Sequence, residues 1–350
     1  MLTLNPQTRK KLARFRKIRL GYFSFLILGA MIALLSVAEL FVNSRALIVH
    51  YNDTLYFPTY GSFYPGTTFG EDYSYEANYR ALAKSFEANG SDNWVLMPLV
   101  PYDPYENDAK DGIMRPEAPD FSVGHYLGTD TTSRDILARL VYGTRTALLF
   151  AFAFMCSVYL IGIVIGCAMG YLGGLFDLFF QRLIEIWSNI PFLYMVIIVF
   201  SVIPSAASIP VRIGILLSVM VLFSWTSMTY SARTETYKEK SRDYVAAARV
   251  MGAGAPRIIF RHILPNVLST LVTFMPFTVV SAISAITALD FLGFGLPVPT
   301  PSLGELLQQG TANLRTAPWI VTAAFGTLVI ILSLVTFIGE AIRESFDPKQ

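Results

Sequence analysis

The chain has 350 residues, of which 53% are hydrophobic and only 15% are charged. Ordinary soluble domains carry roughly 25% charged residues, so this composition argues against a soluble domain and favours an integral membrane protein. The 27 Lys and Arg residues nearly balance the 25 Asp and Glu residues, so no net field indicates nucleic acid or an acidic polymer as a partner.

The N-terminal tail, residues 1–19, holds seven basic residues and no acidic residue. Short basic segments beside a span stay in the cytoplasm, which predicts a cytoplasmic N-terminus. The apolar stretch 20–42 that follows is long enough to cross a bilayer as a helix. Because it is too long for a secretion signal and lacks a convincing cleavage site, we predict a permanent first transmembrane helix.

Residues 43–145 form one long polar segment that is rich in Tyr, Pro, Asp and Gly. Such content predicts irregular structure with short strands rather than long helices. We expect this segment on the outer side of the membrane, as a folded cap over the membrane-spanning part. A partly mobile loop is the alternative interpretation.

Five more apolar segments follow within residues 146–342. Gly162, Gly166 and Gly170 repeat at four-residue spacing and predict a small helix face that another helix can approach closely. Pro191 and Pro276 fall inside two of the segments, where proline usually kinks a helix. With a cytoplasmic tail at 343–350, the sequence predicts an all-α integral membrane protein of six transmembrane helices. The five expected spans after the first are 146–171, 183–203, 212–232, 263–289 and 318–342.

Six crossings place the segment 233–262 in the cytoplasm, and its content of Arg and Lys agrees with that side. Within it, Ser241 is a plausible N-cap, Asp243 brings an acid to the first turn, and Gly252 suits a helix C-terminus. A short helix over 242–251 is therefore predicted. A helix of this length is not stable alone in water, so we expect it to dock on a partner.

The same loop carries a family resemblance. Ala247-Ala248, three residues, Gly252, eleven residues and Leu264-Pro265 form a pattern that resembles the loop in membrane subunits of binding-protein-dependent ABC importers. The stretches that resemble the dipeptide, oligopeptide and nickel permease branch are 127–130, Arg134-Asp135, 143–145, 171–174 with Asp177, 290–296, Gly339-Glu340 and Asp347-Pro348. The stretches that narrow the resemblance to the permease of the microcin C type peptide importer are 13–16, 19–22, Glu39-Leu40 and 56–58.

The resemblance implies that the short helix is a coupling helix, which sits in a groove of an ATP-hydrolysing subunit. It also implies a second permease subunit, one or two ATPase subunits, a periplasmic solute-binding protein and a peptide substrate at the bacterial inner membrane. The coupling residues that it implies are Asp243, Tyr244, Ala246, Ala247, Ala248, Arg249, Gly252, Leu264 and Pro265. We expect the substrate path to pass Asp290, Phe291, Phe294 and Glu305. Interfacial aromatic side chains are the alternative interpretation of the two phenylalanines.

Two positions depart from the family pattern. Ala246 stands where the family usually has glutamate, and we expect Asp243 to supply the charge contact instead. Ser133 stands where glycine is frequent, and we expect this difference only to loosen a turn.

An enzyme activity is not expected in this chain. A phosphate-binding loop of the form G-x-x-x-x-G-K-S/T does not occur in the sequence, so ATP and Mg are assigned to the partner ATPase and no cofactor to this chain. Cys156 and Cys167 lie in one apolar run, where they are expected to pack as small hydrophobic residues. The three histidines are well separated, and we predict no metal site.

A proton-coupled carrier is the main alternative, because carboxylates inside a membrane usually mark function. Glu39, Glu185 and Asp290 come near a span, but each lies close to a predicted end, and no clear inverted repeat is visible. An ATP-driven pore needs a docking loop and a carrier does not. ATP-driven import of peptides is therefore the preferred interpretation, with nickel or another small solute as a further alternative.

Overall fold

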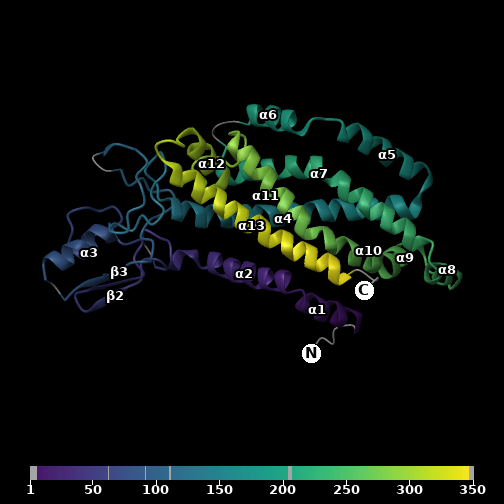
Figure 1. Cartoon of the computed structure of the whole chain (residues 1–350), viewed down its shortest axis with the longest axis horizontal. Coiled ribbons are helices and arrows are strands. Elements are labelled where there is room, and N and C mark those ends of the chain that lie inside the picture. The colour runs from purple at the N-terminus through teal and green to yellow at the C-terminus, as the bar shows by residue number, and fades with distance from the viewer. Residues whose placement is uncertain (1–5, 62, 91, 110–111, 204–206, 347–350) are drawn as a thin grey trace. The chain divides into compact units, whose positions relative to one another are not determined.

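The computed structural model describes residues 6–61, 63–90, 92–109, 112–203 and 207–346 (Figure 1). Two compact units make up the chain, and each combines segments that are far apart in the sequence. We call Met1–Leu28, Leu148–Pro297 and Ile330–Gln350 the helical unit, and Gly29–Ala147 with Val298–Val329 the sheet unit.

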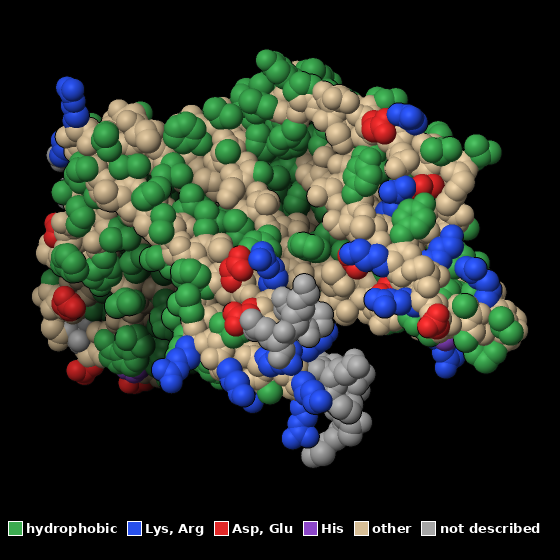
Figure 2. All heavy atoms as spheres, turned by 45° about the vertical axis from the view of Figure 1, so that its right-hand side comes forward, with side chains coloured by type: hydrophobic (Ala, Val, Ile, Leu, Met, Phe, Trp, Pro, Cys, Tyr) green, Lys and Arg blue, Asp and Glu red, His purple; other side chains and the backbone are tan. Residues whose placement is uncertain are grey.

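Long apolar helices dominate the chain, as expected for a membrane protein. The long candidate spans are α2 (Arg19–Ser36), α4 (Ile136–Leu172), α7 (Ile209–Lys240), the stretch Ala255–Phe291 and α13 (Pro318–Phe346). Among the described residues these five are long and apolar enough to cross a membrane, and a bent pair makes a possible sixth. Figure 2 shows that hydrophobic side chains cover much of the visible face. The predicted helical membrane fold is confirmed.

The bent pair replaces the expected span 183–203. It consists of α5 (Gly174–Ser188) and α6 (Phe192–Val202), whose axes differ by 77°. Pro191 gives the physical reason, because proline lacks an N–H and disfavours a helical conformation in the residue before it. The structure therefore has two helices where one kinked helix was expected, and they count as one span only when taken together.

The expected span 263–289 lies within a helical stretch that changes its hydrogen-bonding type. Its segments are α9 (Ala255–Ile258), the π-helix η4 (Ile259–Ile263), α10 (Leu264–Leu271), the 3₁₀ turn η5 (Val272–Phe274) and α11 (Met275–Phe291). The irregular turns come directly before Pro265 and Pro276. Proline crowds the carbonyl four residues earlier, so the turn before it adopts wider or tighter bonding. Pro276 was expected to kink its helix, and the structure shows a local change of helix type in the turn before it.

Other bounds differ from the expected ones because side chains decide where helices begin. The helix expected from residue 146 begins at Ile136, since Asp135 Oδ1 accepts a hydrogen bond from Ala138 N at 2.7 Å and caps it. The first span ends at Ser36 and not at residue 42. The remaining short elements are α1 (Pro6–Lys17), η1 (Ala38–Leu40), η2 (Gly66–Phe69) and α12 (Leu303–Ala312).

The glycine stripe of α4 packs against α7 within the helical unit. A Cβ atom added at Gly162 or at Gly170 would lie 2.7 Å from the Cβ atom of Met228 or of Thr236, respectively. Real Cβ atoms do not come this close, so larger residues would push the two helices apart. The predicted small face is confirmed, and its partner is a helix of the same chain.

The sheet unit holds an antiparallel sheet in the order β2-β1-β3. Its elements are β1 (Ile48–Tyr51), β2 (Thr54–Tyr56), β3 (Trp94–Leu96) and helix α3 (Tyr79–Ala88). Asn52 and Asp53 join β1 to β2 with φ values of 47° and 59°, the positive range that a two-residue hairpin turn requires. The buried core is Ala46, Val49, Phe69, Ala77, Tyr79, Leu82 and Phe86. The predicted short strands are present and form part of a packed element.

A buried histidine crosslinks the sheet unit. His125 Nδ1 lies 2.8 Å from Asp135, its Nε2 lies 3.2 Å from Asp108, and its ring stacks on Tyr102. Burial lowers the pKa of His125, but hydrogen bonds to Asp108 and Asp135 outweigh this effect and raise the pKa to about 9. The imidazole is therefore protonated at neutral pH and bridges two carboxylates.

Raising the pH should weaken this bridge. The pKa of His125 is about 9 in the folded chain against 6.5 for an ordinary histidine, so the stabilisation is fully present below pH 6.5 and is lost as the pH rises through 9. We expect a loss on the order of 1–3 kcal/mol. Thermal unfolding of the purified chain at several pH values measures it, with His125→Gln as the comparison. If His125→Gln lost as much stability at alkaline pH as the parent, the proposed bridge from His125 to the two carboxylates would be contradicted.

Candidate functional site

The candidate site is the loop 241–265, which connects α7 to α10. Its main element is helix α8 (Asp243–Val250), so the predicted short helix is present. Ser241 is not its N-cap, because Ser241 ends α7 and its hydroxyl donates to Lys238 O at 2.8 Å. Arg242 occupies the N-cap position without a side-chain cap. Asp243 lies in the first turn of α8, as expected.

Gly252 ends α8 in the geometry that was predicted for it. Its φ is +83°, Gly252 N donates to Arg249 O at 3.0 Å, and Ala253 N donates to Ala248 O at 3.0 Å. These two bonds form a Schellman motif, which satisfies the last carbonyls of a helix and favours glycine at the left-handed position. A Cβ atom at Gly252 would meet nothing within 4 Å in this chain, so the space beside it is open.

One face of α8 is packed and the other is open. Val245 and Ala248 are buried against the rest of the loop, whereas Val250 is 89% exposed and Met251 is 79% exposed. Ala246 and Ala247 are also exposed, and so is Phe260 in the adjoining π-helix. We call Ala246, Ala247, Val250, Met251 and Phe260 the open apolar face. Exposed apolar side chains beside small ones indicate a surface that a partner covers.

Tyr244 fastens α8 to its neighbours. Its hydroxyl donates to Glu239 at 2.6 Å and accepts from Asn266 Nδ2 at 3.1 Å, so it links α7 and α10. Burial, together with the hydrogen bond to Glu239, raises the pKa of Tyr244 to about 12. Leu264 and Pro265 begin α10 beside this contact. The guanidinium of Arg249 lies 5.9 Å from the ring centre of Tyr171.

An ion pair that the sequence argument did not single out joins α7 to α5. Arg233 donates to both carboxylate oxygens of Asp177, at 2.6 and 2.7 Å, and Tyr237 donates to Asp177 at 2.9 Å. One turn further along, Lys240 donates to Tyr171 O at 2.6 Å. The sequence signal was the spacing of four and three residues, which places 233, 237 and 240 on one helix face. Helix α7 is thereby held to the turn between α4 and α5 immediately before α8 begins.

The motif 290–296 folds as a closed turn at the end of α11. Gly293, with φ of +81°, donates to Asp290 O, and Phe294 N donates to Leu289 O, which repeats the Schellman geometry. Asp290 is buried, and its Oδ1 accepts from Leu296 N at 2.6 Å. Phe291 is exposed and Phe294 is half-buried. A place for these three residues along a substrate path stays a prediction.

Glu305 belongs to a buried ion cluster in the sheet unit. It lies in the first turn of α12, pairs with Arg134 at 2.9 Å and also pairs with Arg139. Asp130 completes the cluster, 2.8 Å from Arg134 and 3.5 Å from Arg139. Asp130, Arg134 and Arg139 are buried and Glu305 is partly exposed, so two carboxylates balance two guanidinium groups that have little contact with water. Glu305 therefore has a structural role, while its predicted place along a substrate path is untested.

Ser133 does not loosen its turn, contrary to the expectation. Its φ is +59°, the region in which glycine is favoured, which explains the frequent family glycine. The Ser133 hydroxyl accepts from Arg115 N at 2.9 Å and donates to Arg115 O at 3.0 Å. Two hydrogen bonds hold the serine in this conformation and keep the turn closed.

The structure brings the expected coupling residues together in one loop of the helical unit. It assigns Asp290, Phe291 and Phe294 to one turn and Glu305 to the ion cluster. Asp347-Pro348 lies outside the described residues. Within the described ranges, no group of three or more His, Cys, Asp and Glu side chains is arranged to hold a metal ion.

Fold and site together define a helical membrane protein of several spans that exposes a short apolar-faced helix between two of them. The chain belongs to the family of binding-protein-dependent transport system inner membrane components, whose model matches residues 162–350. The resemblance drawn from the sequence motifs is confirmed.

Similar proteins agree with the family over most or all of the chain. The "Inner membrane ABC transporter permease protein YejE" of Escherichia coli is 39% identical and covers 100% of this chain and 99% of its own length. The "Peptidoglycan transport system permease protein YejE" of Agrobacterium fabrum is 34% identical, over 99% of this chain and 94% of its own. The "Dipeptide transport system permease protein DppC" of Haemophilus influenzae is 36% identical, over 73% of this chain and 85% of its own.

Proposed function

We propose that this chain is the permease subunit of an ATP-driven importer of peptides or peptide-like compounds, and that α8 docks on a partner ATPase. The observation that carries the proposal is the open apolar face of α8. Helix α8 lies in a loop between two candidate spans, and it ends at Gly252, which has open space beside it.

Contacts inside the helical unit support a coupling role for α8. Only Ser241 and Arg242 separate α7 from α8. A displacement of α8 would therefore pull directly on α7. The bonds from Arg233 to Asp177 and from Lys240 to Tyr171 would pass this movement to the turn between α4 and α5. Closure of an ATPase pair could move the helices around a central path in this way.

The remaining parts of the proposal concern partners, substrate and orientation. The family supports a second permease, ATPase subunits and a periplasmic solute-binding protein as partners. Relatives named for dipeptide and for peptidoglycan transport support a peptide or peptide-like substrate. The basic tail 1–19 and the basic loop 233–262 support a cytoplasmic position for both termini and a periplasmic position for 43–145.

A proton-coupled carrier has less support. It would need a carboxylate within the membrane that can take up and release a proton. Glu39 pairs with Arg145 at 2.6 Å, Glu185 pairs with Arg182 at 2.6 Å, and Asp290 accepts a backbone hydrogen bond. Each of these carboxylates therefore already has a hydrogen-bond or ion-pair partner within this chain.

ATP dependence tests the proposal. In liposomes, the chain by itself should neither bind nor hydrolyse ATP, whereas the complex with its ATPase and second permease should hydrolyse ATP. With the binding protein present, the complex should import a labelled peptide only when ATP is supplied. A non-hydrolysable ATP analogue serves as the matched control, because it occupies the same site without supplying energy.

Two outcomes would contradict the proposal. Uptake that follows the proton gradient and persists without ATP would indicate a carrier. Uptake of nickel in place of any peptide, under the same ATP dependence, would keep the ATP-driven mechanism but overturn the substrate class.

A further inference from the structure

Helix α1 concentrates positive charge directly before the first span. It contains six basic residues and no acidic residue, and only Ile18 separates it from α2. Basic residues next to a span attract the phosphate groups of membrane lipids, and each Lys or Arg adds to this attraction. The start of α2 exposes large apolar side chains, among them Leu20 and Phe23. The basic side chains of α1 are thus followed directly along the chain by the exposed apolar side chains of α2.

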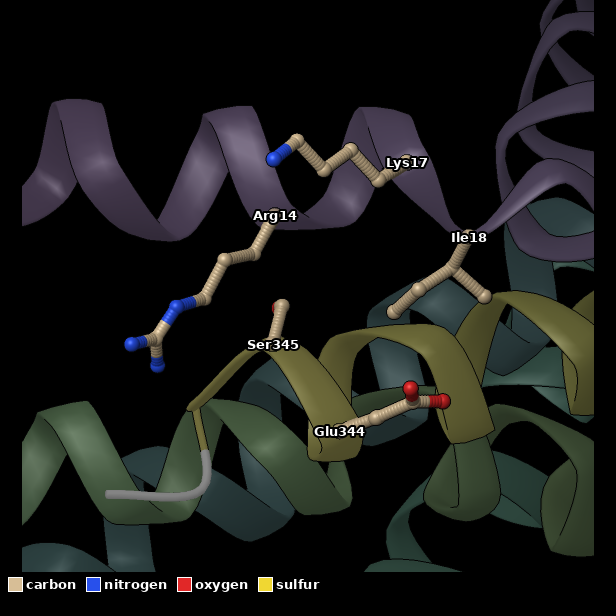
Figure 3. A pocket seen from close by; sticks show the side chains of 5 residues that line it. All are labelled: Arg14, Lys17, Ile18, Glu344 and Ser345. Atoms are coloured by element: carbon tan, nitrogen blue, oxygen red, sulfur yellow. The ribbon is translucent and has the colours of Figure 1, made fainter. Parts of the chain in front are cut away.

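A cavity of about 350 Å³ lies beside this charge. Figure 3 shows its walls: Arg14 extends from α1 and Ile18 from the residue after α1 toward the end of α13, and Lys17 runs back along α1 toward Arg14. Glu344 and Ser345 line it from α13. Lys11 Nζ lies 4.0 Å from the ring centre of Phe346, which holds the two helices together at this end. All these residues belong to the helical unit.

We propose that this cavity binds the headgroup of a membrane phospholipid. Arg14 and Lys17 would bind the phosphodiester, because both are hydrogen-bond donors with permanent positive charge. Ile18 and the apolar start of α2 would contact the acyl chains. Glu344 would accept hydrogen bonds from a primary ammonium group, so the walls suit phosphatidylethanolamine better than phosphatidylglycerol.

The arrangement of charges on α1 provides a matched control. Lys10, Arg14 and Lys17 lie along one side of the helix, and Arg9 and Arg16 lie about 80° to 160° away from them at about 100° per residue. Arg14→Gln with Lys17→Gln removes two charges from the cavity, whereas Arg9→Gln with Arg16→Gln removes two charges from the other side. If the lipid were held only by general electrostatic attraction, the two double variants would weaken its binding equally, because each removes two positive charges.

Lipid titration of the purified full chain tests the proposal. Native mass spectrometry measures binding of phosphatidylethanolamine, phosphatidylglycerol and phosphatidylcholine, with inorganic phosphate as a competitor. We expect the Arg14/Lys17 variant to bind phosphatidylethanolamine about thirtyfold more weakly, and the Arg9/Arg16 variant to change by about threefold or less. Glu344→Gln should abolish the preference for phosphatidylethanolamine over phosphatidylglycerol. Melting temperatures confirm that the variants remain folded.

Three results would overturn the proposal. Equal weakening in both double variants would show unspecific attraction to lipid surfaces. Displacement of the lipid by millimolar inorganic phosphate would show a site for a free anion. An unchanged headgroup preference in Glu344→Gln would exclude the ammonium contact.

Discussion

Replacing Glu305 with alanine is expected to destabilise the sheet unit by about 3–5 kcal/mol, because it leaves a buried guanidinium without its carboxylate. Arg139 is fully buried, and its remaining carboxylate partner, Asp130, lies 3.5 Å away and already pairs with Arg134. Thermal or chemical unfolding of the purified chain measures the loss. The sheet unit should also become more sensitive to proteolysis, since Glu305 no longer joins α12 to Arg134 and Arg139.

A surface ion pair provides the control for this prediction. Glu185 pairs with Arg182 at 2.6 Å, and both side chains are largely exposed. Glu185→Ala should therefore cost less than about 1 kcal/mol, as is usual for exposed ion pairs. Should Glu305→Ala retain the parent's stability and lose only peptide uptake, the structural role would be wrong and the predicted substrate path would gain support.

Replacing Gly252 with arginine is expected to abolish peptide uptake while the protein remains inserted and abundant. The left-handed conformation at φ of +83° would strain an arginine by about 1 kcal/mol or more. The new side chain would also occupy the open space beside α8, where the ATPase is proposed to dock. Uptake measured in cells that depend on imported peptide, together with co-purification of the ATPase, tests both effects.

The chain offers a control that separates strain from docking. Gly90 also has a positive φ, of +58°, and nothing within 4 Å of an added Cβ atom, but it lies in the sheet unit. Gly90→Arg adds the same charge and similar strain in the sheet unit, outside the loop that carries α8, and it should leave uptake near that of the parent. Ala246→Glu, which restores the usual family residue on the open apolar face, should also be tolerated. Peptide uptake near the parent level in Gly252→Arg would contradict the proposal that α8 docks on the ATPase.

Much of the membrane fold was predictable because local sequence determines it. An apolar stretch of about 20 residues can satisfy its backbone in a bilayer only as a helix, so span number and approximate position follow from hydropathy. The end of α8 was predictable for a similar reason, since Gly252 is the residue that tolerates the left-handed conformation closing a helix. The small face of α4 followed from the four-residue spacing of its glycines.

Helix boundaries and breaks were less predictable because they depend on competition between neighbours. Ser241 has the chemistry of an N-cap, but its hydroxyl is used by the end of α7. Pro191 was expected to kink one helix, and the turn before it opens far enough to separate α5 from α6. Asp135 begins α4 earlier than hydropathy suggested, because the first turns of that helix lie among polar side chains of the sheet unit.

The sequence by itself determined that this chain is a multispan membrane protein of an importer family with a short helix between two spans. Those properties follow from hydropathy, from glycine and proline geometry, and from motifs within short stretches of chain. Only the tertiary structure decided the partners of its charged residues, because residues distant in the chain must meet before their charges can pair. Arg233 pairs with Asp177, Glu305 pairs with Arg134 and Arg139, and His125 bridges Asp108 and Asp135.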